Sequence, residues 1–349
     1  MKMTIVIWRV LFNSVTLPSQ TPFSHHMILF TNICFYVRKC VRSISISSLG
    51  NILSAEPRLL QLKSPAYVFG DFHGNLADLL AFARTLWPLG IHLTPGTFLF
   101  LGDYVDGGLF DLELLSYLFS QKIMFHDKVF LLRGNHEIRS VNSGSLSSPL
   151  SSFLDQLRSR FPEDLALTLW DRTNQVFDHL PLAAVIDDVL FCVHGGVPRP
   201  HRDRSPRSIA QIRRIPAPFD PSKDSAQSDP RESDDLETSE LVADLLWPRP
   251  AGTGEEGACG GSGEGESAVR RFLAGNGLTH VLRGQDSTME GVSVGKDARD
   301  IAICSTSGGL RNGNALCGCI LIDGETLYAI NRPNGTVAEG EVGQNDFVA

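Results

Sequence analysis

Short apolar runs that end at or near glycine recur along the middle of the chain. They lie at 67–70, 97–101, 129–132 and 189–193, and a polar side chain follows each of them within three residues. Runs of this length, rich in Val, Phe and Leu, are typical of buried β-strands. Because the ends of neighbouring strands place side chains beside one another, we expect the polar residues after these four runs to gather at one place.

Segments with helical spacing of apolar positions separate these strands. The clearest extends from Leu76 to Trp87, and further helices are predicted near 41–53, 110–120, 152–160 and 163–175. Strands that alternate with helices predict a layered α/β core.

The later part of the chain has closely spaced apolar runs with turns between them. Residues 180–187 and the run that follows predict a β-hairpin that turns at Asp187 and Asp188. Runs separated by glycine-containing turns predict further antiparallel strands at 300–304, 316–322 and 326–331.

Two insertions of low complexity interrupt this pattern. Residues 220–240 contain eight acidic side chains against two basic ones, and residues 251–267 contain seven glycines and four glutamates. Such compositions predict disordered, solvated loops. We therefore expect a poorly ordered N-terminal extension over 1–44, a main domain over 45–335 that contains both insertions, and a C-terminal tail over 336–349.

Composition narrows the classes of function. The 349 residues, 42% of them hydrophobic, can bury one large core, and the net charge of −8 argues against nucleic-acid binding, which needs a basic face. Seven cysteines without CxxC spacing favour a reducing compartment, cytoplasmic or nuclear. The apolar run 27–37 is shorter than the roughly 20 residues that span a bilayer, so we expect no membrane span. Whether residues 1–44 include a targeting segment stays open.

The polar residues at the four strand ends form a ligand set for divalent metal ions. Asp71 and His73 are two positions apart, so in an extended segment both face one ion. Asp103 can bridge two ions, and Asn135 with His194 can serve the second. A single Asp or His in such a place is more often a turn or cap residue, but five suitable residues at four strand ends predict a two-metal site.

Two further residues have the chemistry of acid catalysis. Two ions roughly 3.5–4 Å apart can hold a bridging hydroxide and clamp a phosphoryl group in line with it, so that no covalent intermediate is needed. His136, next to Asn135, can protonate the leaving oxygen, and Asp106 can hold the resulting imidazolium.

These motifs resemble those of the phosphoprotein phosphatase family, the metal-dependent Ser/Thr phosphatases within the calcineurin-like metallophosphoesterase superfamily. Residues 70–74 are similar to its GDxHG motif, 102–108 to GDxVDRG, 134–137 to GNHE and 194–196 to HGG. Further similar segments lie at 180–187, 211–215 and 244–247.

The resemblance covers about 45–332 and implies a central β-sandwich flanked by helices, with two divalent ions, Mn, Fe or Zn, at the strand ends. It implies hydrolysis of phosphoserine and phosphothreonine in a phosphoprotein substrate, with Asn135 and His136 contacting the phosphate. A regulatory subunit is a further partner that the resemblance allows.

The metal site departs from the family pattern at one ligand. The family's sixth ligand, a histidine, aligns with Gln285, whose amide oxygen binds Mn, Fe or Zn less strongly than imidazole does. His280 is a poor substitute, because along an extended strand it faces the opposite side from Gln285.

The phosphate-binding residues depart further. Gly107 stands where the family has an arginine. The family's second phosphate-binding arginine would fall in the glycine-rich insertion 251–267, which contains none, and the tyrosine of a later family loop is missing from 305–309. Losing one donor to a transition-state charge commonly costs about a hundredfold in rate. The candidate replacements are Arg139, Arg249 and Arg311, for each of which a surface salt bridge is the more ordinary role.

Three hypotheses follow. The first is a working metal-dependent Ser/Thr phosphatase with altered phosphate binding, favoured by the retained pair of His136 and Asp106. The second is a pseudophosphatase that acts as an interaction module, favoured by Gly107 and Gln285. The third is a small-molecule phosphoesterase such as a dinucleoside-polyphosphate hydrolase, against which the segments 180–187 and 211–247 argue.

Overall fold

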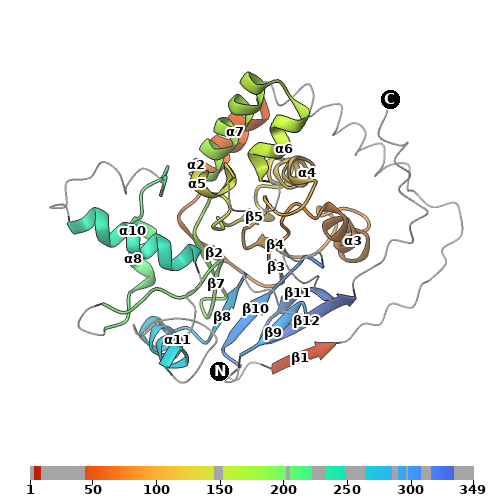
Figure 1. Cartoon of the computed structure of the whole chain (residues 1–349). Coiled ribbons are helices and arrows are strands. Elements are labelled where there is room, and N and C mark those ends of the chain that lie inside the picture. The colour runs from red at the N-terminus through yellow and green to blue at the C-terminus, as the bar shows by residue number, and fades with distance from the viewer. Residues whose placement is uncertain are drawn as a thin grey trace, which may run out of the picture.

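Two six-stranded β-sheets, with helices on their outer faces, form the core of the computed structural model (Figure 1). The first sheet has the order β1-β12-β11-β3-β4-β5 and the second β2-β6-β7-β8-β10-β9. The structure describes residues 4–8, 44–144, 152–201, 205–221, 233–247, 264–284, 290–295, 298–307 and 316–333. The predicted β-sandwich flanked by helices is confirmed.

The strands of the first sheet are β1 (Thr4–Trp8), β12 (Thr326–Pro333), β11 (Leu316–Asp323), β3 (Ala66–Phe69), β4 (Thr97–Phe100) and β5 (Val129–Leu131). Those of the second are β2 (Leu59–Leu62), β6 (Ala183–Ile186), β7 (Leu190–Val193), β8 (His280–Arg283), β10 (Asp300–Ile303) and β9 (Val292–Val294). The helices are α2 (Ile44–Ser54), α3 (Leu76–Leu86), α4 (Asp111–Met124), α5 (Arg139–Asn142), α6 (Phe153–Arg160), α7 (Glu163–Phe177), α8 (Ile209–Arg214), α10 (Ser233–Leu246) and α11 (Glu264–Asn276).

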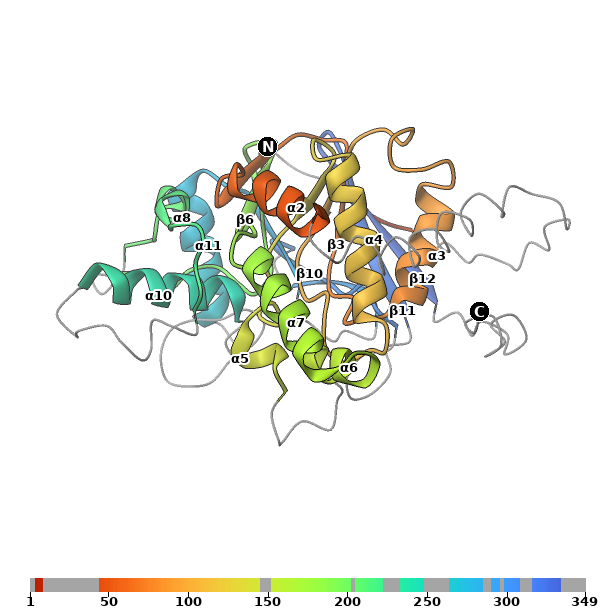
Figure 2. The same cartoon turned by 90° about the horizontal axis from the view of Figure 1, so that it is seen from above.

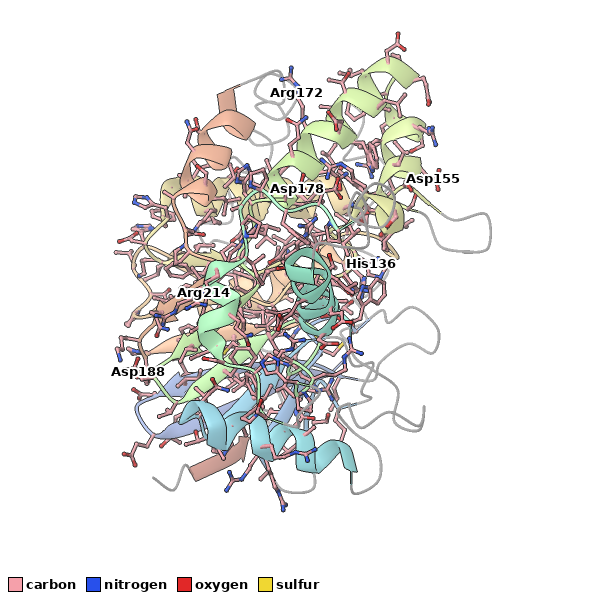
Figure 3. All side chains as sticks on the ribbon, turned by 90° about the vertical axis from the view of Figure 1, so that its left-hand side faces the viewer. His136, Asp155, Arg172, Asp178, Asp188 and Arg214 are labelled. Atoms are coloured by element: carbon pink, nitrogen blue, oxygen red, sulfur yellow. The ribbon has the colours of Figure 1, made fainter. Side chains whose placement is uncertain are left out.

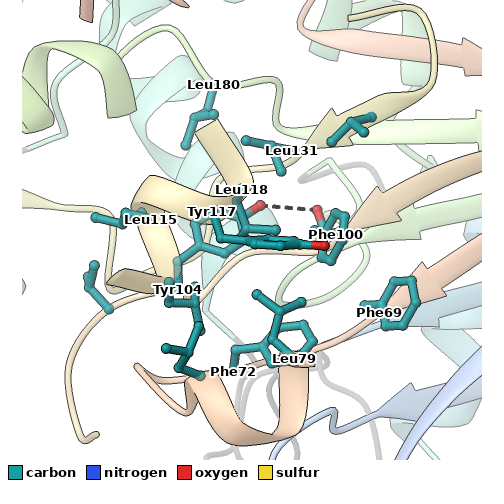
Figure 4. Close-up of a cluster of buried hydrophobic side chains, with 14 of the residues drawn as sticks. Phe69, Phe72, Leu79, Phe100, Tyr104, Leu115, Tyr117, Leu118, Leu131 and Leu180 are labelled. Atoms are coloured by element: carbon teal, nitrogen blue, oxygen red, sulfur yellow. Dashed lines mark hydrogen bonds between the residues drawn. The ribbon is translucent and has the colours of Figure 1, made fainter. Parts of the chain in front are cut away.

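Three apolar layers follow from the alternation of side chains along the strands. In the first sheet, Val68 and Leu99 point between the sheets, where they meet Ile186 and Ile301 of the second. Their neighbours in sequence point outward, against α3, α4, α6 and α7; Phe69 and Phe100 stack there with ring centroids 4.9 Å apart (Figure 4). Helices α8, α10 and α11 cover the outer face of the second sheet (Figure 2).

Most of the predicted strands and helices are present. The four apolar runs form β3, β4, β5 and β7, and the predicted hairpin is the antiparallel pair β6 and β7, with Asp187 and Asp188 at positive φ in its turn. The strands β11 and β12 pair antiparallel as expected, but β10 does not follow this pattern throughout. It is antiparallel to β9 and parallel to β8, because the chain first runs back along the sheet in β9 and then returns in β10, between β8 and β9.

The structure describes parts of three segments for which the sequence predicts disorder. Residues 4–8 of the N-terminal extension form β1, which pairs in parallel with β12. The acidic segment 220–240 is helical from Ser233, and the glycine-rich segment 251–267 is helical from Glu264. Both helices continue into apolar stretches that pack on the second sheet, and average composition does not reveal this continuation. The division at 335 and the C-terminal tail lie outside the described residues.

The two sheets meet at the carboxyl ends of β3 and β10. Asp71, just after β3, forms a parallel bridge with Cys304, just after β10. Gly70 permits this approach, because a Cβ at that position would lie 1.8 Å from the carbonyl oxygen of Ile303. The loops that leave β3, β4, β5 and β7 therefore open at one edge of the sandwich. Within the described part of the chain, no helix has the length and apolar character to cross a bilayer.

Candidate metal centre and active site

The structure brings the five predicted metal-binding residues together. Asp71 and His73 follow β3, Asp103 follows β4, Asn135 follows β5 and His194 follows β7. Two groups of potential ligand atoms result, one containing His73 and the other His194, and Asp103 belongs to both.

The two oxygens of Asp103 face different groups. Its Oδ1 lies 3.3 Å from Nε2 of His194, and its Oδ2 lies 3.6 Å from Nε2 of His73. Asp71 is divided in the same way, with Oδ2 3.6 Å from His73 Nε2 and Oδ1 3.7 Å from His194 Nδ1. Asn135 Oδ1 lies 2.8 Å from His194 Nε2. A carboxylate with its oxygens so divided has the arrangement of a bridging ligand between two ions.

These distances fit ligands that share an ion. Ligand atoms about 2.1 Å from one ion lie roughly 3.0–3.4 Å from one another, close to the spacings of 3.3 and 3.6 Å around Asp103. The carboxylates are buried, and buried carboxylates need a compensating positive charge. Oxygen and imidazole ligands suit Mn, Fe or Zn, so the residues present fit two divalent ions.

The pKa values of the neighbouring histidines also indicate that the buried carboxylates favour a positive charge beside them. Burial acts to lower the pKa of His194, but the charge and hydrogen bond of Asp103 and the charge of Asp71 outweigh it and raise this pKa to about 9. Burial likewise opposes protonation of His73, whose pKa is raised to about 8 by Asp71 and Asp103. In turn, burial acts to raise the pKa of Asp103, but the neighbouring histidines hold it well below its ordinary value. Protonated imidazoles thus balance charges that metal ions would balance when bound.

Strained backbone holds the metal-binding side chains in place. His73, Asp103 and Asp106 have φ of 47°, 55° and 66°, in the left-handed region that residues other than glycine seldom adopt. The backbone N–H groups of His73 and Phe72 both donate to the carbonyl oxygen of Asp103, at 2.9 and 3.1 Å. The loops after β3 and β4 therefore fix each other.

Glu137 joins the loops after β4 and β5, a role that its place in the GNHE motif did not reveal. Its buried carboxylate accepts hydrogen bonds from the backbone N–H groups of Asp103, Tyr104 and Gly134, at 2.8, 2.8 and 2.9 Å. Burial and the charge of Asp103 raise the pKa of Glu137 to about 7, against the lowering effect of these hydrogen bonds. The signal available in the sequence was a carboxylate directly followed by an apolar residue at the start of a helix, which is too common to be specific.

Two glycines give the site its close packing. A Cβ on Gly134 would lie 2.2 Å from Oδ1 of Asp103, and a Cβ on Gly284 would lie 2.6 Å from Oδ1 of Asp71. Gln285, the predicted weak ligand, directly follows Gly284 and lies outside the described residues, as do Arg249 and Arg311. His280 begins β8, at the opposite end of that strand from Gly284, so it is not a ligand.

His136 and Asp106 form the predicted hydrogen-bonded pair. Nδ1 of His136 lies 2.7 Å from Oδ2 of Asp106, and the other oxygen of Asp106 accepts the backbone N–H of Phe153 at 2.7 Å. Burial acts to lower the pKa of His136, but the charge of Asp103 and the hydrogen bond and charge of Asp106 raise it to about 9. The imidazole, labelled in Figure 3, is 21% exposed, and its Nε2 lies 4.0 Å from Oδ2 of Asp103. A protonated nitrogen therefore stands beside the metal-binding carboxylate.

Arg139 is an ion-pair residue in this structure. Its Nη1 lies 2.9 and 2.8 Å from the two oxygens of Asp178 and 3.1 Å from Asp220. Arg133 also donates to Asp178, and its guanidinium donates twice to the carbonyl oxygen of Glu137. The expected salt bridge of Arg139 is present but largely buried, with 15% of its side chain exposed. The guanidinium of Arg139 thus binds carboxylates of the protein itself.

A profile of the calcineurin-like phosphoesterase family matches residues 64–284. The serine/threonine-protein phosphatase BSL2 of Arabidopsis thaliana is 32% identical to the chain over 294 residues, which are 81% of this chain and 26% of the plant protein. The chain therefore spans about a quarter of the length of that relative.

Solved structures share the fold. A protein serine/threonine phosphatase from Saccharomyces cerevisiae, described as similar to human phosphatase PP5, has a TM-score of 0.62 at 23% identity, covering 83% of this chain and 88% of the yeast chain. A cold-active protein-tyrosine phosphatase of a psychrophilic Shewanella species has a TM-score of 0.53 at 19% identity, covering 81% and 84%. At these identities the likeness concerns the fold alone.

Proposed function

Because the chain belongs to the calcineurin-like phosphoesterase family, we propose that it hydrolyses phosphoserine and phosphothreonine in protein substrates with two divalent metal ions. The name of the Arabidopsis relative supports this substrate class. The observation that carries the proposal is the combination of a divided Asp103 carboxylate with an intact pair of His136 and Asp106 beside it. A cytoplasmic or nuclear location and a regulatory subunit stay predictions.

The metal-binding residues prepare the site for attack on phosphorus. Two divalent ions in such a site supply a water of lowered pKa and positive charge for the phosphoryl oxygens. Asp71, His73, Asp103, Asn135 and His194 are the residues that would hold them. Asp103 is fixed by its positive φ and by the hydrogen bond from its N–H to Glu137, so its two oxygens are directed to the two groups before any ligand binds.

His136 is placed to protonate the leaving oxygen of the substrate. Oδ2 of Asp106 accepts a hydrogen bond from Nδ1–H of His136, which leaves the Nε2 proton directed toward the predicted metal ligands. The carboxylates of Asp103 and Asp106 raise the pKa of this ring, which favours its protonated form. The hydrogen bond from Phe153 to Asp106 fixes the carboxylate and, through it, the orientation of the imidazole.

One observation favours an interaction module without turnover. Gly107 has a φ of 98°, so the turn where the resembling family carries a phosphate-binding arginine is built around glycine. The site therefore lacks one charged donor to the phosphate while it retains the acid and the metal-binding residues.

The test measures metal and turnover on the same preparation. Metal content by mass spectrometry is compared with hydrolysis, in manganese, of an aryl phosphate, of phosphoserine, phosphothreonine and phosphotyrosine peptides, and of a dinucleoside polyphosphate. We expect about two ions per chain and turnover of the phosphoserine and phosphothreonine peptides that His136→Ala abolishes.

The variant Asp171→Asn serves as the control. Asp171 is exposed, and among the described hydrogen bonds its side chain contacts only Gln175 of the same helix. Binding of phosphopeptide without turnover would establish the interaction module instead. Turnover confined to phosphotyrosine or to the dinucleotide would refute the proposed substrate class.

A further inference from the structure

Two large apolar side chains are exposed directly after the turn that contains Asp106 and Gly107. Leu109 is 68% exposed and Phe110 is 41% exposed, and they are consecutive in sequence. They come three and four residues after Asp106, the partner of the proposed general acid. Exposure of such side chains to water is unfavourable relative to their burial against another apolar surface.

Hydrogen bonds to the backbone hold this exposed pair in place. The carbonyl oxygen of Leu109 accepts from Nη2 of Arg160 at 2.7 Å, and the N–H of Phe110 donates to the carbonyl oxygen of Gly74 at 3.2 Å. The carbonyl oxygen of Gly108, one residue earlier, accepts from Nε2 of Gln156 at 3.1 Å. The backbone of residues 108–110 is thus tied to α6 and to the loop after β3, so the backbone that carries the two apolar side chains does not need to be ordered when a ligand arrives.

The same loop is packed against the metal-binding loop. A Cβ on Gly108 would lie 2.3 Å from the carbonyl oxygen of His73, so the exposed pair begins one residue beyond a direct backbone contact with that loop. Leu109 and Phe110 therefore lie beside the loop that carries His73, and we call this pair the rim of the proposed active site.

The chemistry of this rim is apolar and carries no cation of its own. The sequence has no lysine or arginine between Asp103 and Gln121, and the nearby Arg160 is paired with Glu113 at 2.6 Å. An acidic residue beside the phosphorylated one would meet Glu113 and no free cation in this loop, whereas an apolar residue can bury surface against Leu109 and Phe110.

We propose that Leu109 and Phe110 form a specificity rim that contacts an apolar side chain close in sequence to the phosphorylated residue of the substrate protein. This inference rests on the proposed function, because it takes a phosphoprotein as the occupant of the site. The rim adds affinity where the turn at Gly107 lacks the arginine, through apolar contact with the peptide in place of charge on the phosphate.

The experiment scans one leucine through the positions on either side of phosphoserine, in a peptide otherwise made of alanine, serine and glycine. Turnover of each peptide is divided by the turnover of an aryl phosphate by the same protein, which cancels changes in the chemical step. Affinity for phosphonate analogues of the same peptides measures the rim independently of turnover.

We expect leucine at one of the scanned positions to improve kcat/KM and affinity roughly 3- to 10-fold over alanine, as partial burial of one such side chain allows. The variant with Leu109→Ser and Phe110→Ser loses this preference. The control variant with Leu89→Ser and Leu93→Ser retains it. Leu89 and Leu93 are 70% and 63% exposed, but they precede β4 and so lie at the opposite end of that strand.

Each outcome has one meaning. An unaltered preference in the rim variant, no leucine preference in the native chain, or equal loss in the control variant overturns the rim. Failure to hydrolyse any phosphate ester refutes the proposed function, and the phosphonate affinities then still decide whether the rim selects an apolar neighbour.

Discussion

Replacing Asp106 by asparagine tests the assignment of the general acid. In the native chain, Oδ2 of Asp106 accepts a hydrogen bond from Nδ1–H of His136 at 2.7 Å. Its Oδ1 accepts a hydrogen bond from the backbone N–H of Phe153. In Asp106→Asn the amide oxygen can keep the bond from Phe153, which turns the NH₂ group toward His136. Nδ1 must then accept a hydrogen bond, and the ring becomes a neutral imidazole, which is a poor proton donor.

The size of the effect follows from the pKa of His136, which is about 9 in the native chain. A carboxylate in contact with a charged partner shifts a pKa by about 1–3 units. Above the pKa of His136, the protonated fraction falls about tenfold for each unit by which that pKa is lowered. Because the orientation of the proton is lost as well, we expect kcat to fall roughly 10²-fold, with KM changed by less than about threefold because Asp106 has no substrate contact of its own.

The pH dependence of kcat should shift in a definite direction in this variant. A general acid works in its protonated form, so activity is lost as the pH rises through the pKa of His136. Lowering that pKa moves the alkaline limb of the kcat profile to lower pH in Asp106→Asn. The assay compares aryl phosphate hydrolysis from pH 6 to 10 at one manganese concentration, with Asp171→Asn as the matched control. An unshifted alkaline limb with kcat within threefold of the native value would contradict the role assigned to the pair.

Three further changes test the support around the site. Asp103→Asn should reduce the metal content measured by mass spectrometry to one ion per chain or fewer, because the bridging charge is lost, whereas Asp171→Asn should keep the native content. Arg133→Met should lower the free energy of unfolding in urea by about 1–3 kcal/mol, since it leaves the buried Glu137 carbonyl without its donor and leaves Asp178 with Arg139 alone. Arg158→Met, at an exposed ion pair, should change it by less than about 1 kcal/mol. Gly134→Ala should weaken manganese binding at least about tenfold, because its Cβ would lie 2.2 Å from Oδ1 of Asp103; Gly50→Ala, in a helix and without a neighbour within 4 Å, should leave it unchanged. Native values in any of the three site variants would count against the contact concerned.

The strands that carry the site were predictable because each has a recognisable local sequence pattern. β3, β4, β5 and β7 are short apolar runs that end near glycine, and the residues that follow them are chemically suited to metal ions. The geometry of a sheet then brings the ends together without further information. The pair of His136 and Asp106 was predictable for the same reason, since both residues lie in the loops that follow these strands.

Contacts between distant segments were not predictable in this way. β2 and β9 each contain a polar residue, Gln61 and Ser293, that interrupts the apolar run. The joint role of Glu137 depends on three backbone N–H groups from two loops, and no side-chain pattern marks backbone donors. In α10, the acidic residues that suggested a disordered loop precede the buried Leu241, Val242 and Leu245, so one helix includes both the solvated and the packed part.

The turn at Gly107 shows why a missing arginine is not simply a missing charge. Its φ of 98° favours glycine, so an arginine introduced there would carry a backbone strain of order 1–3 kcal/mol unless the turn rearranged. The two residues after Gly108 are exposed and apolar, and their backbone is fixed by Gln156, Arg160 and Gly74. The conformation of the turn and the exposure of Leu109 and Phe110 are therefore parts of one local structure, and restoring the cation alone would have to change both.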